Sequence, residues 1–147
     1  MATALFPGSF DPFTKGHEAV LRRVLPLFDH IVVAVGQNSE KQCMFSPDER
    51  VARIREALAD CPSVEVLAYS GMTVDLCHSV GAQCIIRGIR TAEDFEYEQL
   101  IASVNRQQDP TIETLLVMAD AKHRNISSTL ERERLSHSGN QATNDPQ

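Results

Sequence analysis

The chain has 147 residues, of which 42% are apolar and 23% are charged, and its formal net charge is −6. These values are ordinary for one soluble globular domain that buries a substantial core. They argue against a membrane protein, because no apolar run approaches about 20 residues, and against a nucleic-acid-binding protein, which usually carries a basic surface.

Short apolar runs alternate with amphipathic segments from the start of the chain. Residues 4–6 predict a first strand, and residues 16–25 have the apolar spacing of a helix. Residues 31–35 are β-branched and apolar on both faces, which is typical of a buried parallel strand. The beginning of the chain therefore predicts a strand, a helix and a second strand.

A second helix is predicted to begin at Ser46. Ser46 can cap the helix, Pro47 suits its first turn, and Glu49 completes a capping box. The residues expected on its inward stripe are Val51, Ile54 and Leu58.

The alternation continues to residue 135. The remaining predicted strands cover residues 64–68, 84–86 and 114–118, and the remaining predicted helices cover residues 73–80, 92–105 and 128–135. Repeated β-α units predict an α/β domain over residues 1–135, with a Rossmann-like five-stranded parallel sheet and helices on both faces. Residues 136–147 are almost devoid of apolar side chains, and we expect a disordered tail there.

The first residues and the cysteines indicate the compartment. The chain does not begin with a basic segment followed by a long apolar one, so we expect no secretory signal and a cytoplasmic location. The cysteines show neither a CxxC pair nor metal-ligand spacing, and we expect four free thiols rather than two disulfides. They are Cys43, Cys61, Cys77 and Cys84.

The first chemically unusual segment, FPGSFDPFTKGH, covers residues 6–17 between a strand and a helix. Ligands of open parallel sheets bind beyond the carboxyl ends of the strands. A helix start there offers unpaired N–H groups and a positive dipole end to a phosphate, which His17 would face. The alternative is a capping loop with a surface histidine, but Ser9 and Thr14 in the same loop favour a phosphate site.

Two later segments carry similar chemistry. Arg87 and Arg90 follow a buried strand and can make bidentate contacts to phosphate oxygens, with Gly88 between them for close approach of a ligand; the alternative is a solvated charge pair. Residues 127–129 are Ser-Ser-Thr before the last predicted helix and can both cap it and bind an anion. Lys41 is a weaker candidate. A few cations focused in a cleft can bind phosphate inside an acidic protein.

Together these motifs resemble the nucleotidyltransferase superfamily that carries an (H/T)xGH motif and a later ISSTxxR motif. Residues 14–17 match the first motif, and residues 126–132 match the second. Within the superfamily the chain is most similar to the bacterial phosphopantetheine adenylyltransferases, through PGSFDPFTKGH, residues 44–51 and IIRGIRTAEDFEYE. The similarity extends over residues 3–135.

The resemblance implies a reaction in which ATP and 4′-phosphopantetheine give dephospho-coenzyme A and pyrophosphate. The acceptor already carries a phosphate nucleophile, so direct in-line attack needs neither a protein base nor a covalent intermediate. Mg²⁺ is expected to arrive on the nucleotide phosphates, without dedicated protein ligands. The family also implies a homohexamer, with coenzyme A as a candidate feedback ligand and with no nucleic-acid or membrane partner.

The resemblance also assigns roles to residues. His17, Lys41 and Arg90 are expected to be catalytic, with His17 stabilising charge on the α-phosphate. The residues expected to bind the acceptor are Ser9, Lys41, Thr73 and Arg87. The residues expected to bind ATP are Ser9, Phe10, His17, Gly88, Ile89, Arg90, Glu98, His123, Arg124, Asn125, Ile126, Ser127, Ser128 and Thr129.

Two other functions stay open at this point. The first is a related nucleotidyltransferase with another acceptor, such as nicotinamide mononucleotide or a phosphorylated alcohol. The second is a non-catalytic sensor of nucleotide or coenzyme A on the same fold. Residues 122–125 also differ from the family's usual aromatic-Ser-Phe stretch, and Ser9 stands where threonine is commoner.

Overall fold

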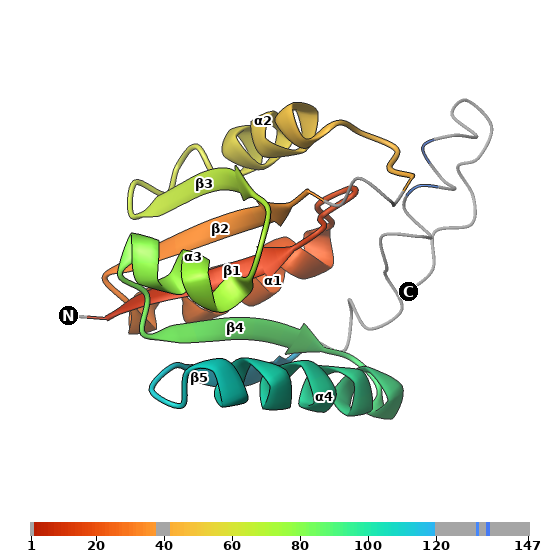
Figure 1. Cartoon of the computed structure of the whole chain (residues 1–147). Coiled ribbons are helices and arrows are strands. Elements are labelled where there is room, and N and C mark those ends of the chain that lie inside the picture. The colour runs from red at the N-terminus through yellow and green to blue at the C-terminus, as the bar shows by residue number, and fades with distance from the viewer. Residues whose placement is uncertain (1, 38–41, 120–131, 133–134, 136–147) are drawn as a thin grey trace.

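A computed structural model describes residues 2–37, 42–119, 132 and 135 of the chain (Figure 1). Its strands are β1 (Thr3–Gly8), β2 (His30–Gly36), β3 (Val64–Tyr69), β4 (Cys84–Ile89) and β5 (Glu113–Met118). Its helices are α1 (Lys15–Val24), α2 (Pro47–Ala57), α3 (Thr73–Val80) and α4 (Ala92–Gln108), with a short 3₁₀ turn at Leu25–Leu27. Every strand and helix predicted up to residue 118 is therefore confirmed. Most of the helix predicted over residues 128–135, and the whole predicted tail, lie outside the described residues.

The five strands form one parallel sheet in the order β3-β2-β1-β4-β5. Leu5 of β1 lies opposite Val32 of β2 on one side and Ile85 of β4 on the other. The chain thus starts in the middle of the sheet, extends to one edge and then crosses back to build the other. The predicted Rossmann-like five-stranded parallel sheet is confirmed. The structure adds that the strand order reverses beside β1, where such sheets bind ligands.

Two apolar layers cover the two faces of the sheet. On one face, Val20 and Leu21 of α1 and Ile54 of α2 pack against alternate strand residues such as Phe6 and Val33. On the other face, Val74 and Cys77 of α3 pack against the intervening residues, Leu5, Val32 and Ile85. Figure 1 shows α3 and α1 on opposite sides of the central strands. Strands that bury both faces explain the continuous apolar runs in the sequence.

Helix α2 begins with the predicted capping box. Ser46 Oγ accepts a hydrogen bond from the Glu49 N–H at 3.1 Å, and the Ser46 N–H donates to Glu49 Oε1 at 2.9 Å. The inward stripe of Val51, Ile54 and Leu58 is buried as predicted. The four cysteines are free thiols, as expected. Among the helices that the structure describes, none is both long and apolar enough to cross a bilayer.

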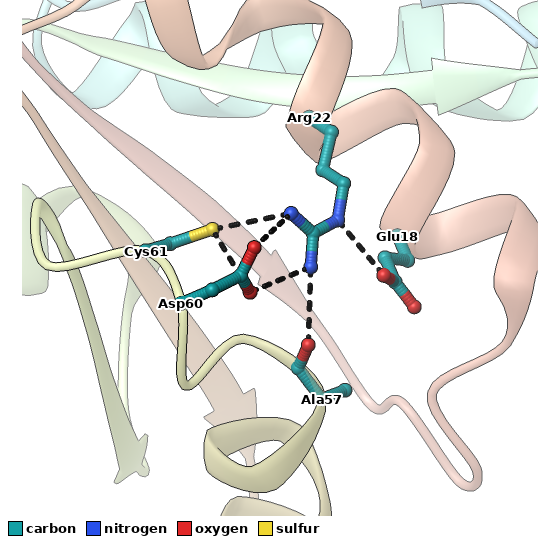
Figure 2. A network of polar contacts seen from close by, with 5 residues as sticks. All are labelled: Glu18, Arg22, Ala57, Asp60 and Cys61. Atoms are coloured by element: carbon teal, nitrogen blue, oxygen red, sulfur yellow. Dashed lines mark hydrogen bonds and ion pairs between the residues drawn. The ribbon is translucent and has the colours of Figure 1, made fainter.

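A polar cluster ties α1 to the loop before β3, at the amino-terminal ends of the strands (Figure 2). We call it the Arg22 clasp; its members are Glu18, Arg22, Ala57, Asp60 and Cys61. The guanidinium donates to Glu18 at 2.8 Å, to both Asp60 oxygens at 2.9 and 3.0 Å, to the Ala57 carbonyl at 3.1 Å and to Cys61 Sγ at 3.5 Å. All five guanidinium N–H groups therefore have a partner.

Candidate active site

A cavity of about 400 Å³ opens at the carboxyl ends of the strands, between the central sheet and α4. Ser9, Thr73 and Arg87, three of the residues predicted to bind the acceptor, line it together with Glu98. Phe10, His17, Gly88, Ile89 and Arg90 are not part of its described lining. Three of the four residues predicted to bind the acceptor thus share one cavity with two of the residues predicted to bind ATP, Ser9 and Glu98.

The loop after β1 turns sharply at Phe10. Its φ of 48° lies in the left-handed region, which non-glycine residues seldom adopt and which concentrates at functional sites. The Phe10 ring packs over Gly8, where a Cβ atom would lie 2.9 Å from the ring. A side chain at position 8 would therefore force the buried Phe10 ring to shift. The half-buried Ser9, which precedes Phe10, lines the cavity.

His17 occupies the third position of helix α1, where it completes a capping box with Thr14. The His17 N–H donates to Thr14 Oγ1 at 3.2 Å, and the Thr14 N–H donates to His17 Nδ1 at 2.9 Å. Because Nδ1 accepts a hydrogen bond, a neutral His17 carries its proton on Nε2. The cap therefore fixes the tautomer and leaves Nε2–H as a donor.

Two aromatic rings hold the imidazole. Phe10 meets it edge to face at 5.0 Å between ring centroids, and Phe13 stacks on it at 5.6 Å. Burial, with the nearby positive charges of Arg90 and Arg87, lowers the pKa of His17 to about 4. His17 is therefore neutral at pH 7, and it can donate a hydrogen bond to phosphate without acting as an acid. The alternative of a freely exposed capping histidine does not fit this environment.

Arg87 lies within β4 and is held on three sides. Its Nε and Nη2 donate to the two oxygens of Glu98 at 2.8 Å each, and its Nη1 donates to the Pro7 carbonyl at 2.6 Å. Three of its five N–H groups thus have partners among the described residues, and one on each terminal nitrogen is left for a bound anion. Glu98, which is predicted to bind ATP, lies in the cavity lining as the partner of Arg87.

Arg90 and Gly88 lie beyond this pair at the end of β4. Asp94 Oδ2 accepts the Arg90 N–H at 2.9 Å and lies 3.5 Å from Arg90 Nε, so the first turn of α4 holds the arginine. A Cβ atom on Gly88 would lie 3.3 Å from Val20 of α1. Packing against α1 is therefore one reason for glycine here, besides the predicted approach of a ligand.

Several predicted site residues lie outside the described residues: Lys41, His123, Arg124, Asn125, Ile126, Ser127, Ser128 and Thr129. Two buried charges near the site, Asp11 and Arg50, were not predicted. Arg50 had a signal in the sequence, because it precedes Ile54 by four residues and so falls on the inward stripe of α2. Asp11 had none, since an acidic residue before proline is typical of an ordinary turn.

The chain is similar to proteins of one activity over most of its length. The family model described as cytidylyltransferase-like matches residues 5–134. A phosphopantetheine adenylyltransferase of Flavobacterium psychrophilum is 45% identical over 139 residues, which are 95% of this chain and 91% of that protein. A protein of the same name from Limosilactobacillus fermentum is 44% identical over 95% of this chain and 81% of its own length.

A solved structure shares the fold. The bifunctional NMN adenylyltransferase/ADP ribose pyrophosphatase of Francisella tularensis is 18% identical, with a TM-score of 0.68, and the match covers 90% of this chain and 41% of that one. The same enzyme in complex with AMP and a manganese ion matches with a TM-score of 0.66 at 16% identity, over 93% of this chain and 42% of that one.

Proposed function

The chain belongs to the cytidylyltransferase-like family and, within it, to the phosphopantetheine adenylyltransferases, and from this we propose that it transfers the adenylyl group of ATP to 4′-phosphopantetheine. The products are dephospho-coenzyme A and pyrophosphate, as in coenzyme A biosynthesis. The observation that carries the proposal is the neutral His17 donor beside a cavity lined by Ser9, Thr73 and Arg87. Such a site can bind two polyanions without supplying a nucleophile of its own.

The reaction then needs one displacement. An oxygen of the acceptor phosphate attacks the α-phosphorus of ATP, a new phosphorus–oxygen bond forms, and the bond to the β-phosphate bridge breaks with pyrophosphate leaving. The acceptor phosphate is already ionised at pH 7, so no base is required. His17 Nε2–H donates to the α-phosphate as negative charge builds there, and Arg90 adds positive charge nearby.

The described residues divide the work between two substrates. We assign the acceptor phosphate to Ser9 and Arg87 and the pantetheine arm to the cavity beside Thr73, whose hydroxyl lies 3.1 Å from the Tyr69 hydroxyl. We assign binding of the nucleotide to the backbone and side chains of Phe10, Gly88, Ile89 and Arg90. From the family we further propose that Lys41 binds the acceptor and that residues 123–129 bind the triphosphate.

We propose that Mg²⁺ arrives bound to the phosphates of the nucleotide substrate. In the portion of the chain that the structure describes, no group of three or more His, Cys, Asp or Glu side chains is arranged to hold a metal ion. Mg²⁺ commonly keeps several waters and binds through substrate phosphates. The ligands of the ion would thus be phosphate oxygens and water, with the protein contributing the donors around them.

We propose that the chain assembles as a homohexamer, and α4 supplies the physical support. The only buried residues of this helix are polar, Glu98 and Asn105. Four apolar side chains spaced along one stripe are instead 38–68% exposed: Tyr97, Leu100, Ile101 and Val104. An apolar stripe of this kind is typical of a protein interface, and light scattering would measure the assembly.

We also propose coenzyme A as a feedback ligand and the cytoplasm as the location of the reaction. Coenzyme A carries the same pantetheine arm as the acceptor, so it would compete for the cavity as a feedback ligand. Four free thiols suit a reducing compartment, and we place the reaction in the cytoplasm.

The test follows pyrophosphate release from ATP and Mg²⁺ with each acceptor in turn. We expect release with 4′-phosphopantetheine and none with nicotinamide mononucleotide or a phosphorylated alcohol. Release only with another acceptor would show a related nucleotidyltransferase. Binding of ATP or coenzyme A without release would show a sensor.

A further inference from the structure

Two charged side chains are buried beneath the loops that form the cavity, and the chemistry proposed above uses neither. Asp11 and Arg50 are each only 2% exposed. Burial of a charge is costly unless its hydrogen bonds are satisfied. Their presence beside the site therefore calls for a specific explanation.

Arg50 joins three loops at the carboxyl edge of the sheet. Its Nη1 donates to the Ser9 carbonyl at 2.7 Å and to the Gly36 carbonyl at 3.2 Å, and its Nε donates to the Phe45 carbonyl at 3.1 Å. No carboxylate pairs with it within the described part of the chain. The guanidinium thus binds backbone from the loop after β1, the end of β2 and the loop before α2.

Asp11 also holds the loop before α2. Its carboxylate accepts the N–H groups of Met44 and Phe45 at 2.7 and 2.9 Å, and it lies 3.5 Å from Arg132. Phe45 is therefore fixed at both polar atoms of its peptide groups, its N–H by Asp11 and its carbonyl by Arg50. Two opposite charges lock this short segment in place.

We propose that Asp11 and Arg50 are positioning residues that preform the acceptor cavity. Ser9, Gly36 and Cys43 all line that cavity, and each is either bound by Arg50 or adjacent to the segment that Asp11 holds. If the lock opens, only a fraction of molecules has the competent cavity, and the apparent affinity for the acceptor falls by that fraction. The identity of the acceptor rests on the proposed function; the lock itself does not.

A control for the change from arginine to lysine lies on the same helix. Arg55, five residues after Arg50, also donates to a backbone carbonyl, that of Val66 at 2.9 Å, but Val66 does not line the cavity. Arg55 is exposed, so Arg55→Lys measures what the loss of one arginine–backbone contact on this helix does away from the cavity. Arg50→Lys keeps the charge but cannot reach three carbonyls, and Asp11→Asn keeps the size of the side chain but loses its charge.

The experiment measures two quantities in the wild-type chain and the three variants. The first is KM for 4′-phosphopantetheine and for ATP. We expect Arg50→Lys and Asp11→Asn to raise the acceptor KM about tenfold or more, the scale of one charged hydrogen bond, while kcat and the ATP KM change less than about threefold. Arg55→Lys should leave both KM values unchanged.

The second quantity is the rate at which iodoacetamide alkylates Cys43, followed by mass spectrometry. Cys43 is half-buried in the locked region while the other three thiols are buried, so its rate reports opening of the lock without any turnover. We expect a rise of about tenfold in both lock variants and none in Arg55→Lys. Unchanged alkylation and an unchanged acceptor KM in the lock variants would overturn the proposal. If the wild-type chain fails to use phosphopantetheine, the function is wrong, but the alkylation rates still decide the lock.

Discussion

Two arginines at opposite ends of the sheet show how the same contacts serve different purposes. Arg22, at the amino-terminal ends of the strands, and Arg87, at the carboxyl ends, each hold a carboxylate with two N–H groups and a backbone carbonyl with a third interaction. Arg22 has partners for all five N–H groups, whereas Arg87 keeps two N–H groups without one among the described residues.

The carboxylates that pair with the two arginines also differ in how deeply they are buried. The Asp60 side chain that pairs with Arg22 is 68% exposed, whereas the Glu98 side chain that pairs with Arg87 is 8% exposed. Arg22 is half-buried and saturated, and its ion pair with an exposed carboxylate contributes little energy, so it mainly joins elements. A partly buried arginine with spare donors at a cavity is oriented to bind an anion. Both ends of the sheet carry an arginine–carboxylate pair, so the pair alone does not identify the binding site. The carboxyl end, which we call the binding edge, is distinguished by the unused donors of Arg87 and their buried surroundings. The amino-terminal end with Arg22 is the structural edge.

The largest effect should come from removing the donor at the binding edge. His17→Ala deletes Nε2–H, and we expect turnover to fall about 100-fold or more, the scale for loss of one transition-state donor. ATP affinity, measured by calorimetry, should change less than about threefold because ground-state contacts stay. Turnover near the wild-type rate would show that His17 is not the donor.

The Arg87 pair should give the next largest effect. Glu98→Gln removes the charge that orients Arg87, and we expect the acceptor KM to rise about tenfold, with a smaller change in the ATP KM. Asp60→Asn makes the matched change in the Arg22 clasp and should alter neither KM. Equal effects of the two substitutions would abolish the distinction between the edges.

A smaller effect is expected on the pH dependence of the free energy of unfolding, to which His17 at the binding edge contributes. Since the folded-state pKa of His17 is lowered to about 4 from an unfolded value of 6.5, the unfolded chain binds the proton more readily. The stability linked to His17 is therefore fully present above pH 6.5 and is lost as the pH falls toward 4. Measured by thermal unfolding, the Tm of the wild type should fall more over this pH window than the Tm of His17→Gln. Parallel pH profiles of the two proteins would contradict the lowered pKa.

The smallest effect is expected at the clasp. Arg22→Ala removes all the clasp contacts, yet exposed ion pairs contribute little, so we expect Tm to fall by at most about 5 °C. Both KM values should match the wild type. A changed acceptor KM would mean that the clasp influences the geometry of the site through α1.

The parts that the sequence predicted depend on local patterns. The strands between residues 3 and 118 follow apolar runs, and the start of α2 follows Ser46, Pro47 and Glu49, which act within one turn. The His17 loop was identified as a phosphate site because glycine, hydroxyl and histidine residues lie together in the sequence.

The parts that the sequence missed depend on distant contacts. Glu98 reaches Arg87 only because α4 folds back along β4, and the lock at Phe45 joins Asp11 and Arg50 across loops more than 30 residues apart in the chain. The lowered pKa of His17 likewise comes first from burial in the folded chain and then from Arg90 and Arg87, which lie at another strand end. Spacing in one sequence does not encode such pairings.

In the proposed mechanism the acceptor phosphate attacks ATP directly, in a site that supplies hydrogen-bond donors and no nucleophile. The most direct test uses ATP made chiral at the α-phosphorus with sulfur and determines the configuration of the dephospho-coenzyme A product. One displacement predicts inversion at phosphorus. Retention would require two displacements through an adenylyl-enzyme and would contradict the mechanism.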